Sequence, residues 1–323
     1  MKIIGKGNKE ILTLDDYKKY APPKEEYQWV DEHSAKEFAR KVVSGTLDNE
    51  LKVLFPGIQV VLAYPEKETC FDQFNGPRNH DLACIAELNN EKIALCFEAK
   101  ATEDFGSTTV KQELVKANNK IQNGENSNVP KRINGLVDKL WNKPIDKNIE
   151  TLRYQLLHAT AGTISFAKEN NINKAIFVVY QLETAKTSSE ICDDHFEALK
   201  DFVNQFGKTI EKNIPCYIKQ IDNVDLSILF LQRKKDIDLE DLHKTWSIIS
   251  KNKYMKTDAQ VINFYRAVQH GKAIVIDASP ETLAALTEDD ADIVKRINLL
   301  FDMMAEVQEK VFGPILEKAL KKD

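Results

Sequence analysis

An uninterrupted apolar run at residues 175–180, Ala-Ile-Phe-Val-Val-Tyr, most narrows the folds that this chain can adopt. Such a run, rich in β-branched residues, is typical of a strand that is covered on both faces of a sheet. Amphipathic patterns typical of long helices precede and follow it, at residues 151–170 and 188–206. We therefore expect an α/β fold.

Upstream of this run, four further segments have clear signatures. Residues 34–43 repeat apolar positions at helical spacing, with Ser34 as the predicted N-cap and Glu37 at the third helical position, as in a capping box. Three strands are predicted at residues 58–64, 81–88 and 92–101. Asn89 and Asn90 suit a hairpin turn between the last two strands, with Glu91 in the connection. The predicted order is helix, three strands, helix, strand.

The chain has 323 residues, about twice the length of a typical single domain. We predict a first domain over residues 1–236, with a helical insertion at about 108–148 and two short strands at 216–220 and 225–231. The composition changes at Arg233-Lys234-Lys235-Asp236. We predict a mainly helical C-terminal domain over residues 237–323, to which the sequence assigns no role.

A final helix is predicted at residues 292–322, with apolar residues at helical spacing from Ile293 to Ile315. This face has two interpretations, packing within the chain and a homodimer seam. We favour the first, because amphipathic helices most often pack within their own chain.

The most informative group of polar residues is Asp81, at the start of one predicted strand, with Glu98 and Lys100 near the end of the next. Side chains alternate along a strand, so Glu98 and Lys100 are expected on one face. Two carboxylates at one point need a cation to offset their repulsion, and oxygen ligands suit Mg²⁺ or Mn²⁺. This pattern indicates metal-assisted hydrolysis, with the lysine orienting a water or stabilising developing negative charge.

The triplet Glu98-Ala99-Lys100, the upstream Asp81 and the order of elements resemble the PD-(D/E)XK nuclease superfamily over residues 30–182. The resemblance implies a restriction-endonuclease-like αβββαβ core, with Asp81 and Glu98 as metal ligands and Lys100 serving the attacking water. It also implies Glu37 as an additional metal ligand and Gln155 as a functional residue on the later helix. His80 stands where the superfamily motif has proline.

Four stretches also resemble a less characterised bacterial family within that fold, which supplies no substrate. They are residues 28–37, 78–81, 98–106 and 153–162.

The charge is unevenly distributed. Lys and Arg total 45 against 50 for Asp and Glu, and this balance of -5 argues against a chain coated in positive charge for nonspecific nucleic-acid binding. Residues 109–147 nevertheless hold eight basic and four acidic residues, 8 - 4 = +4. This insertion can track a phosphate backbone, with Trp141 as a stacking surface, or consist of solvated helices.

Two features bear on location. The first residues lack the apolar block of a signal peptide, and no stretch approaches the roughly 18 apolar residues of a membrane span. The five cysteines are odd in number, widely spaced and without a CxxC pair, which suits reduced thiols. We therefore expect a cytoplasmic protein that does not bind membranes.

The function expected from these features is a metal-dependent nuclease acting on DNA. One alternative is a catalytically inactive nuclease-fold protein that binds DNA or another protein, and a second is a metal-dependent hydrolase of another phosphate ester. The simpler alternative for Glu98 and Lys100 is an exposed ion pair on an edge strand, worth about 0 to 1 kcal/mol. For His80 a packing role is favoured over catalysis, and for His158 a structural hydrogen bond over substrate contact.

Overall fold

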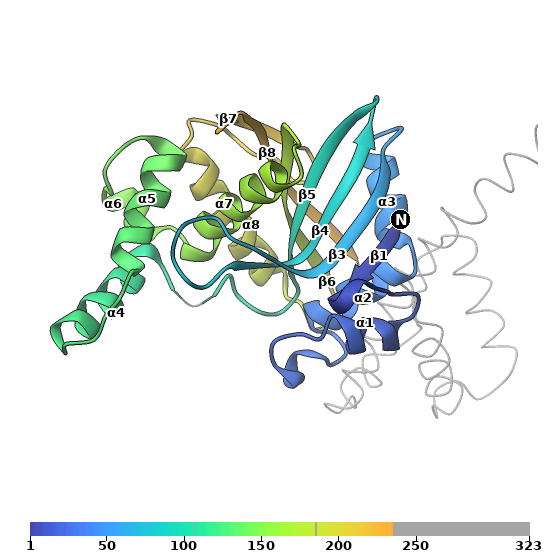
Figure 1. Ribbon diagram of the computed structural model, residues 1–323, viewed down its shortest axis with the longest axis horizontal. Helices are drawn as coiled ribbons and strands as arrows, with labels where there is room; N and C mark the ends of the chain where they lie inside the picture. The colour runs from blue at the N-terminus through green and yellow to red at the C-terminus, as the bar shows by residue number, and fades with distance from the viewer. Residues whose placement is uncertain (107, 185, 235–323) are drawn as a thin grey trace, which may run out of the picture. The chain divides into compact units, whose positions relative to one another are not determined.

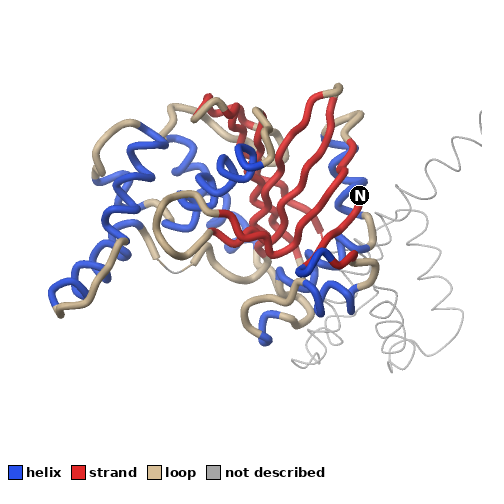
Figure 2. The backbone as a smooth tube through the Cα atoms, in the orientation of Figure 1, coloured by secondary structure: helices blue, strands red, loops and turns tan. Residues whose placement is uncertain are grey.

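In the computed structural model, which describes residues 1–106, 108–184 and 186–234, eight strands form one mixed sheet with helices on both faces (Figures 1 and 2). These residues belong to the first compact unit of the chain, residues 1–235. The strands lie in the order β2-β1-β3-β4-β5-β6-β8-β7. Their bounds are β1 Lys2–Gly5, β2 Lys9–Glu10, β3 Gln59–Thr69, β4 Arg78–Leu88, β5 Glu91–Lys100, β6 Lys174–Glu183, β7 Cys216–Ile221 and β8 Val224–Lys234.

Eight α-helices accompany the sheet within the described residues. They are α1 Leu14–Tyr20, α2 Ser34–Val43, α3 Thr46–Leu54, α4 Val110–Gln122, α5 Val129–Trp141, α6 Lys147–Thr151, α7 Tyr154–Glu169 and α8 Ser189–Asn204. The predicted α/β class is confirmed, and all six elements of the predicted helix, three-strand, helix, strand order are present as α2, β3, β4, β5, α7 and β6.

The sheet combines an antiparallel meander with parallel crossovers. β3, β4 and β5 pair antiparallel, whereas β6 pairs parallel with both β5 and β8. β6 is buried at every position from Ala175 to Leu182, so the prediction of a strand covered on both faces is confirmed.

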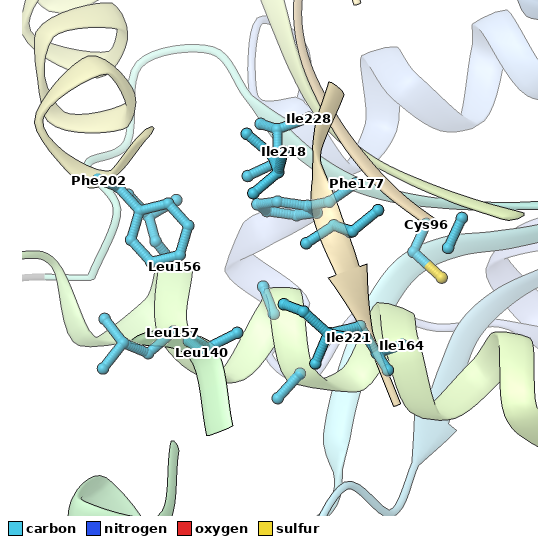
Figure 3. Packing of buried hydrophobic residues seen from close by; sticks show 14 of the residues in the cluster. Cys96, Leu140, Leu156, Leu157, Ile164, Phe177, Phe202, Ile218, Ile221 and Ile228 are labelled. Atoms are coloured by element: carbon cyan, nitrogen blue, oxygen red, sulfur yellow. The ribbon is translucent and has the colours of Figure 1, made fainter. Parts of the chain in front are cut away.

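Two apolar clusters cover the two faces of the sheet, and β5 contributes alternately to each. Ala94 and Cys96 belong to the cluster that includes α5, α7 and α8, part of which Figure 3 shows. Leu95 and Phe97 belong to the cluster that includes α1, α2 and α3. The burial of β5 between these layers follows from the strand alternation.

The β4–β5 hairpin turns at Asn89 and Asn90, whose φ angles are 53° and 64°. Positive φ at both central residues is the signature of a two-residue type I′ turn, which asparagine tolerates better than most residues. The predicted turn is confirmed, except that Glu91 is the first residue of β5 and not part of the connection.

The predicted capping box on α2 is wrong. His33, not Ser34, is the N-cap, and its side chain makes no capping bond. The hydroxyl and amide of Ser34 instead donate to the Glu103 carboxylate, which follows β5. A partner 69 residues away in the chain has replaced the local one.

The predicted helix at residues 151–170 is interrupted. Leu152 and Arg153 have extended backbones that separate α6 from α7, and Arg153 forms an isolated bridge with Thr109. α7 therefore begins at Tyr154, which puts Gln155 in its first turn.

Both helices of the predicted insertion are present as α4 and α5. Trp141, for which stacking on nucleic acid was one of two interpretations, packs on Phe202 and Phe206, with ring centroids 5.4 and 5.1 Å away. Lys139 pairs with Asp222 at 2.9 Å. Part of the insertion's polar and aromatic surface is thus used within the fold.

The elements β1, β2, α1 and α3 were not predicted from the sequence. Conversely, the predictions for residues 237–323, including the domain boundary at 236 and the dimer face from Ile293 to Ile315, lie outside the described residues. All five cysteines lie within the described ranges as free thiols. Among the helices described, none is both long and apolar enough to cross a membrane.

Candidate functional site

The predicted pair Glu98 and Lys100 lies at the end of β5, in the interior of the sheet. Glu98 is 3% exposed and Lys100 6% exposed. Lys100 Nζ lies 2.8 Å from Glu98 Oε1, so the two side chains share a face as expected. The alternative of an exposed edge-strand ion pair is wrong, because β5 runs between β4 and β6 and both charges are buried.

Asp81 lies beside this pair, where the β4–β5 ladder stops. The last backbone pair is Leu82 with Phe97, and beyond it Asp81 Oδ2 accepts a hydrogen bond from the Ala99 amide at 2.6 Å. The Asp81 carboxylate thus replaces a backbone carbonyl as the hydrogen-bond acceptor for the Ala99 amide, between Glu98 and Lys100.

Gln155 reaches the same point from the first turn of α7. Its Nε2 donates to Glu98 Oε1 at 2.6 Å. Four of the five predicted site residues, Asp81, Glu98, Lys100 and Gln155, are therefore brought together by β4, β5 and α7.

Glu37, predicted as an additional metal ligand, is buried on α2. Its Oε1 accepts hydrogen bonds from the Glu32 amide at 3.0 Å and from Arg40 Nη1 at 2.7 Å. Its role as a metal ligand stays a prediction.

Arg78, the first residue of β4, is a member of the site that the sequence analysis gave no role. Its Nη2 contacts Glu98 Oε2, and the residue is 8% exposed. Its aliphatic stem packs on α7 at Gly162, where an added Cβ would lie 2.9 Å from Arg78 Cγ. Simple strand alternation would place a residue three positions before Asp81 on the opposite face, so the sequence pattern gave no signal for Arg78.

Glu66 on β3 is the second member that was missed. The pairs Pro65 with Leu82 and Lys67 with His80 place it opposite Asp81. Its φ of 49° is unusual for glutamate, and its Oε2 accepts a hydrogen bond from Asn79. Only the strand register reveals this residue.

Burial dominates the electrostatics of the site. Desolvation raises the pKa of Asp81 although Lys100 and Arg78 act to lower it. Desolvation, then the neighbouring Asp81, raise the pKa of Glu66 to about 8. Burial lowers the pKa of Lys100, which Asp81 opposes. Burial therefore disfavours the charged forms of Asp81 and Glu66 more strongly than the neighbouring cations favour them.

A divalent cation would favour the ionised form of these carboxylates, and the oxygen donors of Asp81 and Glu98 have the chemistry that Mg²⁺ and Mn²⁺ prefer. In the described residues no group of three or more His, Cys, Asp or Glu side chains is arranged to hold a metal ion. Magnesium sites commonly use one or two carboxylates and complete the shell with water and substrate phosphate. The donor set therefore fits such an ion.

Two histidines of the site region are packed. His80 is fully buried, and its Nε2 would lie 2.8 Å from a Cβ added at Gly162, which agrees with the packing role favoured from the sequence. His158 stacks on Phe71 with ring centroids 6.3 Å apart. Burial holds the pKa of both imidazoles well below the ordinary value.

The Phe105 ring lies between Lys100 and His195 and contacts both. The Phe105 ring lies 5.6 Å from Lys100 Nζ and packs edge-on against His195 at 5.0 Å. His195 Nδ1 is 2.6 Å from Gln181 Oε1. Burial, followed by the Lys100 charge, lowers the pKa of His195 to about 4.

This lowered pKa predicts an acid-dependent loss of stability from His195. Below pH 6.5 His195 binds a proton in the unfolded protein, whereas in the folded protein it binds one only near pH 4. The contribution of His195 to the free energy of unfolding therefore falls as the pH is lowered from 6.5 to 4, by at most ~1.4 kcal/mol per pH unit. The free energy of unfolding of wild type should approach that of His195→Gln over this window. Urea unfolding at a series of pH values measures the difference, and a pH-independent difference would contradict the prediction.

The fold and this site define an α/β protein with a buried cluster of carboxylates and cations at the end of a central hairpin. The chain belongs to the family described as Domain of unknown function (DUF6946), whose family model matches residues 10–235. No curated protein and no solved structure matches the chain.

Proposed function

We propose that this protein is a divalent-metal-dependent nuclease that hydrolyses phosphodiester bonds in DNA in the cytoplasm. The observation that carries the proposal is the meeting of Asp81, Glu98 and Lys100 where β4 begins and β5 ends, with Asp81 bonded to the amide between the other two.

The architecture supports the same proposal. The elements α2, β3, β4, β5, α7 and β6 follow one another in the order of the restriction-endonuclease-like core. β4 begins and β5 ends at one edge of the hairpin, where the PD-(D/E)XK resemblance expects the metal ligands.

Each residue has a distinct part in the proposed reaction. Asp81 and Glu98 would hold Mg²⁺ or Mn²⁺, which when bound polarises a phosphoryl oxygen and lowers the pKa of a coordinated water. Lys100 presents an ammonium beside Glu98, where it orients the attacking water and stabilises negative charge on the phosphate. Gln155 fixes the orientation of the Glu98 carboxylate through its 2.6 Å hydrogen bond.

The test is a Mn²⁺ titration with a parallel DNA cleavage assay on wild type and Asp81→Asn. Asp81→Asn removes a charged ligand, and we expect Mn²⁺ affinity to fall about tenfold or more and cleavage about a hundredfold or more. Asp222→Asn is the matched control, because Asp222 pairs with Lys139 and Lys168 away from the site. Equal cleavage by wild type and Asp81→Asn would refute the proposal.

One observation favours a second candidate, a catalytically inactive member of the same fold that binds DNA or a protein. Glu98 is already paired with two cations, Arg78 and Lys100. An anion neutralised in this way attracts a metal ion less strongly. This candidate predicts DNA or protein binding without measurable Mn²⁺ binding or cleavage in the same assays.

A further inference from the structure

Arg78 contacts Glu98 Oε2, the carboxylate oxygen through which Glu98 would bind a metal ion. Glu98 Oε1 lies within 2.8 Å of Lys100 Nζ and accepts from Gln155 Nε2 at 2.6 Å. Glu98 Oε2 contacts Arg78 Nη2. A cation that binds Glu98 through Oε2 must therefore displace the guanidinium of Arg78.

A displaced Arg78 requires another anion. The residue is 8% exposed, and within the described part of the chain its Nε already has no hydrogen-bond partner. A guanidinium stays charged at all ordinary pH values, and leaving it buried and unpaired is costly. Two other acids lie near Arg78: Asp81 is committed to the same metal ion in the proposed reaction, and Glu66 accepts a hydrogen bond from Asn79.

We propose that Arg78 is a substrate-binding residue that exchanges Glu98 for a phosphate of the DNA when metal binds. This inference rests on the proposed nuclease function. The planar fork of arginine donors matches the non-bridging oxygens of a phosphate. Because the stem of Arg78 is packed on Gly162, the exchange requires movement of the guanidinium end alone.

The exchange predicts effects of opposite sign on metal and on DNA. Arg78→Gln removes the competitor for Glu98, so we expect Mn²⁺ alone to bind about tenfold more tightly than to wild type. The same variant should bind a short duplex DNA about tenfold more weakly when Ca²⁺ replaces the catalytic ion. A purely structural role for Arg78 would weaken both.

The salt dependence of DNA binding gives a second readout. Loss of one phosphate contact should reduce the slope of log K against log salt by about 1. This reduction should occur with Ca²⁺ present and disappear in EDTA, because without metal Arg78 remains on Glu98. Fluorescence anisotropy of labelled DNA measures both slopes.

Two further variants complete the experiment. Arg233→Gln is the matched control, since Arg233 bonds to Asn213 at the end of β8, and it should leave Mn²⁺ affinity and the salt slope unchanged. Arg78→Lys keeps the charge without the fork and serves if Arg78→Gln does not fold. We expect its DNA affinity to lie between those of wild type and Arg78→Gln.

The outcomes separate this inference from the proposed function. If wild type cleaves no DNA, the proposed nuclease function is refuted. If Arg78→Gln nevertheless reduces the salt slope of DNA binding only when metal is present, the exchange is supported. Unchanged Mn²⁺ affinity together with an unchanged slope in Arg78→Gln refutes the exchange, whether or not wild type cleaves DNA.

Discussion

Glu98→Gln is expected to lower the free energy of unfolding by about 3–5 kcal/mol, because it leaves Arg78 and Lys100 as buried cations without their shared anion. The same change should reduce metal-dependent DNA cleavage by about a hundredfold or more. Chemical denaturation measures the first effect, and initial cleavage rates below the unfolding transition measure the second.

Glu50→Gln separates these two effects. Glu50 is another buried carboxylate, 2.8 Å from Lys41 Nζ and 2.5 Å from the Tyr180 hydroxyl, on the face covered by α2 and α3. Its replacement should also cost several kcal/mol, about 3 or more, by breaking a buried ion pair. Cleavage per folded molecule should remain at the wild-type level. A parallel loss of cleavage in both variants would attribute the effect of Glu98→Gln to instability alone.

Gly162→Ala is expected to destabilise the protein by about 1–3 kcal/mol, because its Cβ would stand 2.8 Å from His80 Nε2 and 2.9 Å from Arg78 Cγ. This cost exceeds the roughly 1 kcal/mol that alanine gains over glycine inside a helix. Since Arg78 contacts Glu98, cleavage should fall with stability.

The control for this prediction is Gly135→Ala on α5. Among the described residues, no packing neighbour outside the local helix backbone lies within 4 Å of a Cβ added there, so only the helix preference acts, and stability should rise by about 0.5–1 kcal/mol. Thermal or urea unfolding of the two variants should therefore give changes of opposite sign. Two changes of the same sign would contradict the close packing of β4 on α7.

The central strands were predictable because their signals are local. β6 is an apolar run, and Asn89 and Asn90 favour the turn of the hairpin whatever surrounds it. β1 is different: Lys2 and Ile3 pair parallel with β3, and Ile4 and Gly5 pair with the two-residue strand β2. A strand that depends on a partner more than fifty residues away leaves little trace in its own composition.

The candidate site was predictable where it depends on strand alternation and strand order. Glu98 and Lys100 share a face through simple alternation, and the strand order brings Asp81 beside them. Arg78 and Glu66 were missed because their places depend on the β3–β4 register and on the close approach of α7. Ser34 shows the converse, since a strong local capping signal lost its serine to Glu103.

The two-residue turn at Asn89 and Asn90 sets the geometry of the site from the opposite end of the hairpin. Every cross-strand pair from Leu88 with Glu91 to Leu82 with Phe97 is counted from that turn. Because strand side chains alternate, one inserted or deleted residue there would shift Glu98 relative to Asp81 and rotate one of them out of the cluster. The two-residue length of this turn therefore determines which side chains of β4 and β5 meet at the open end of the hairpin.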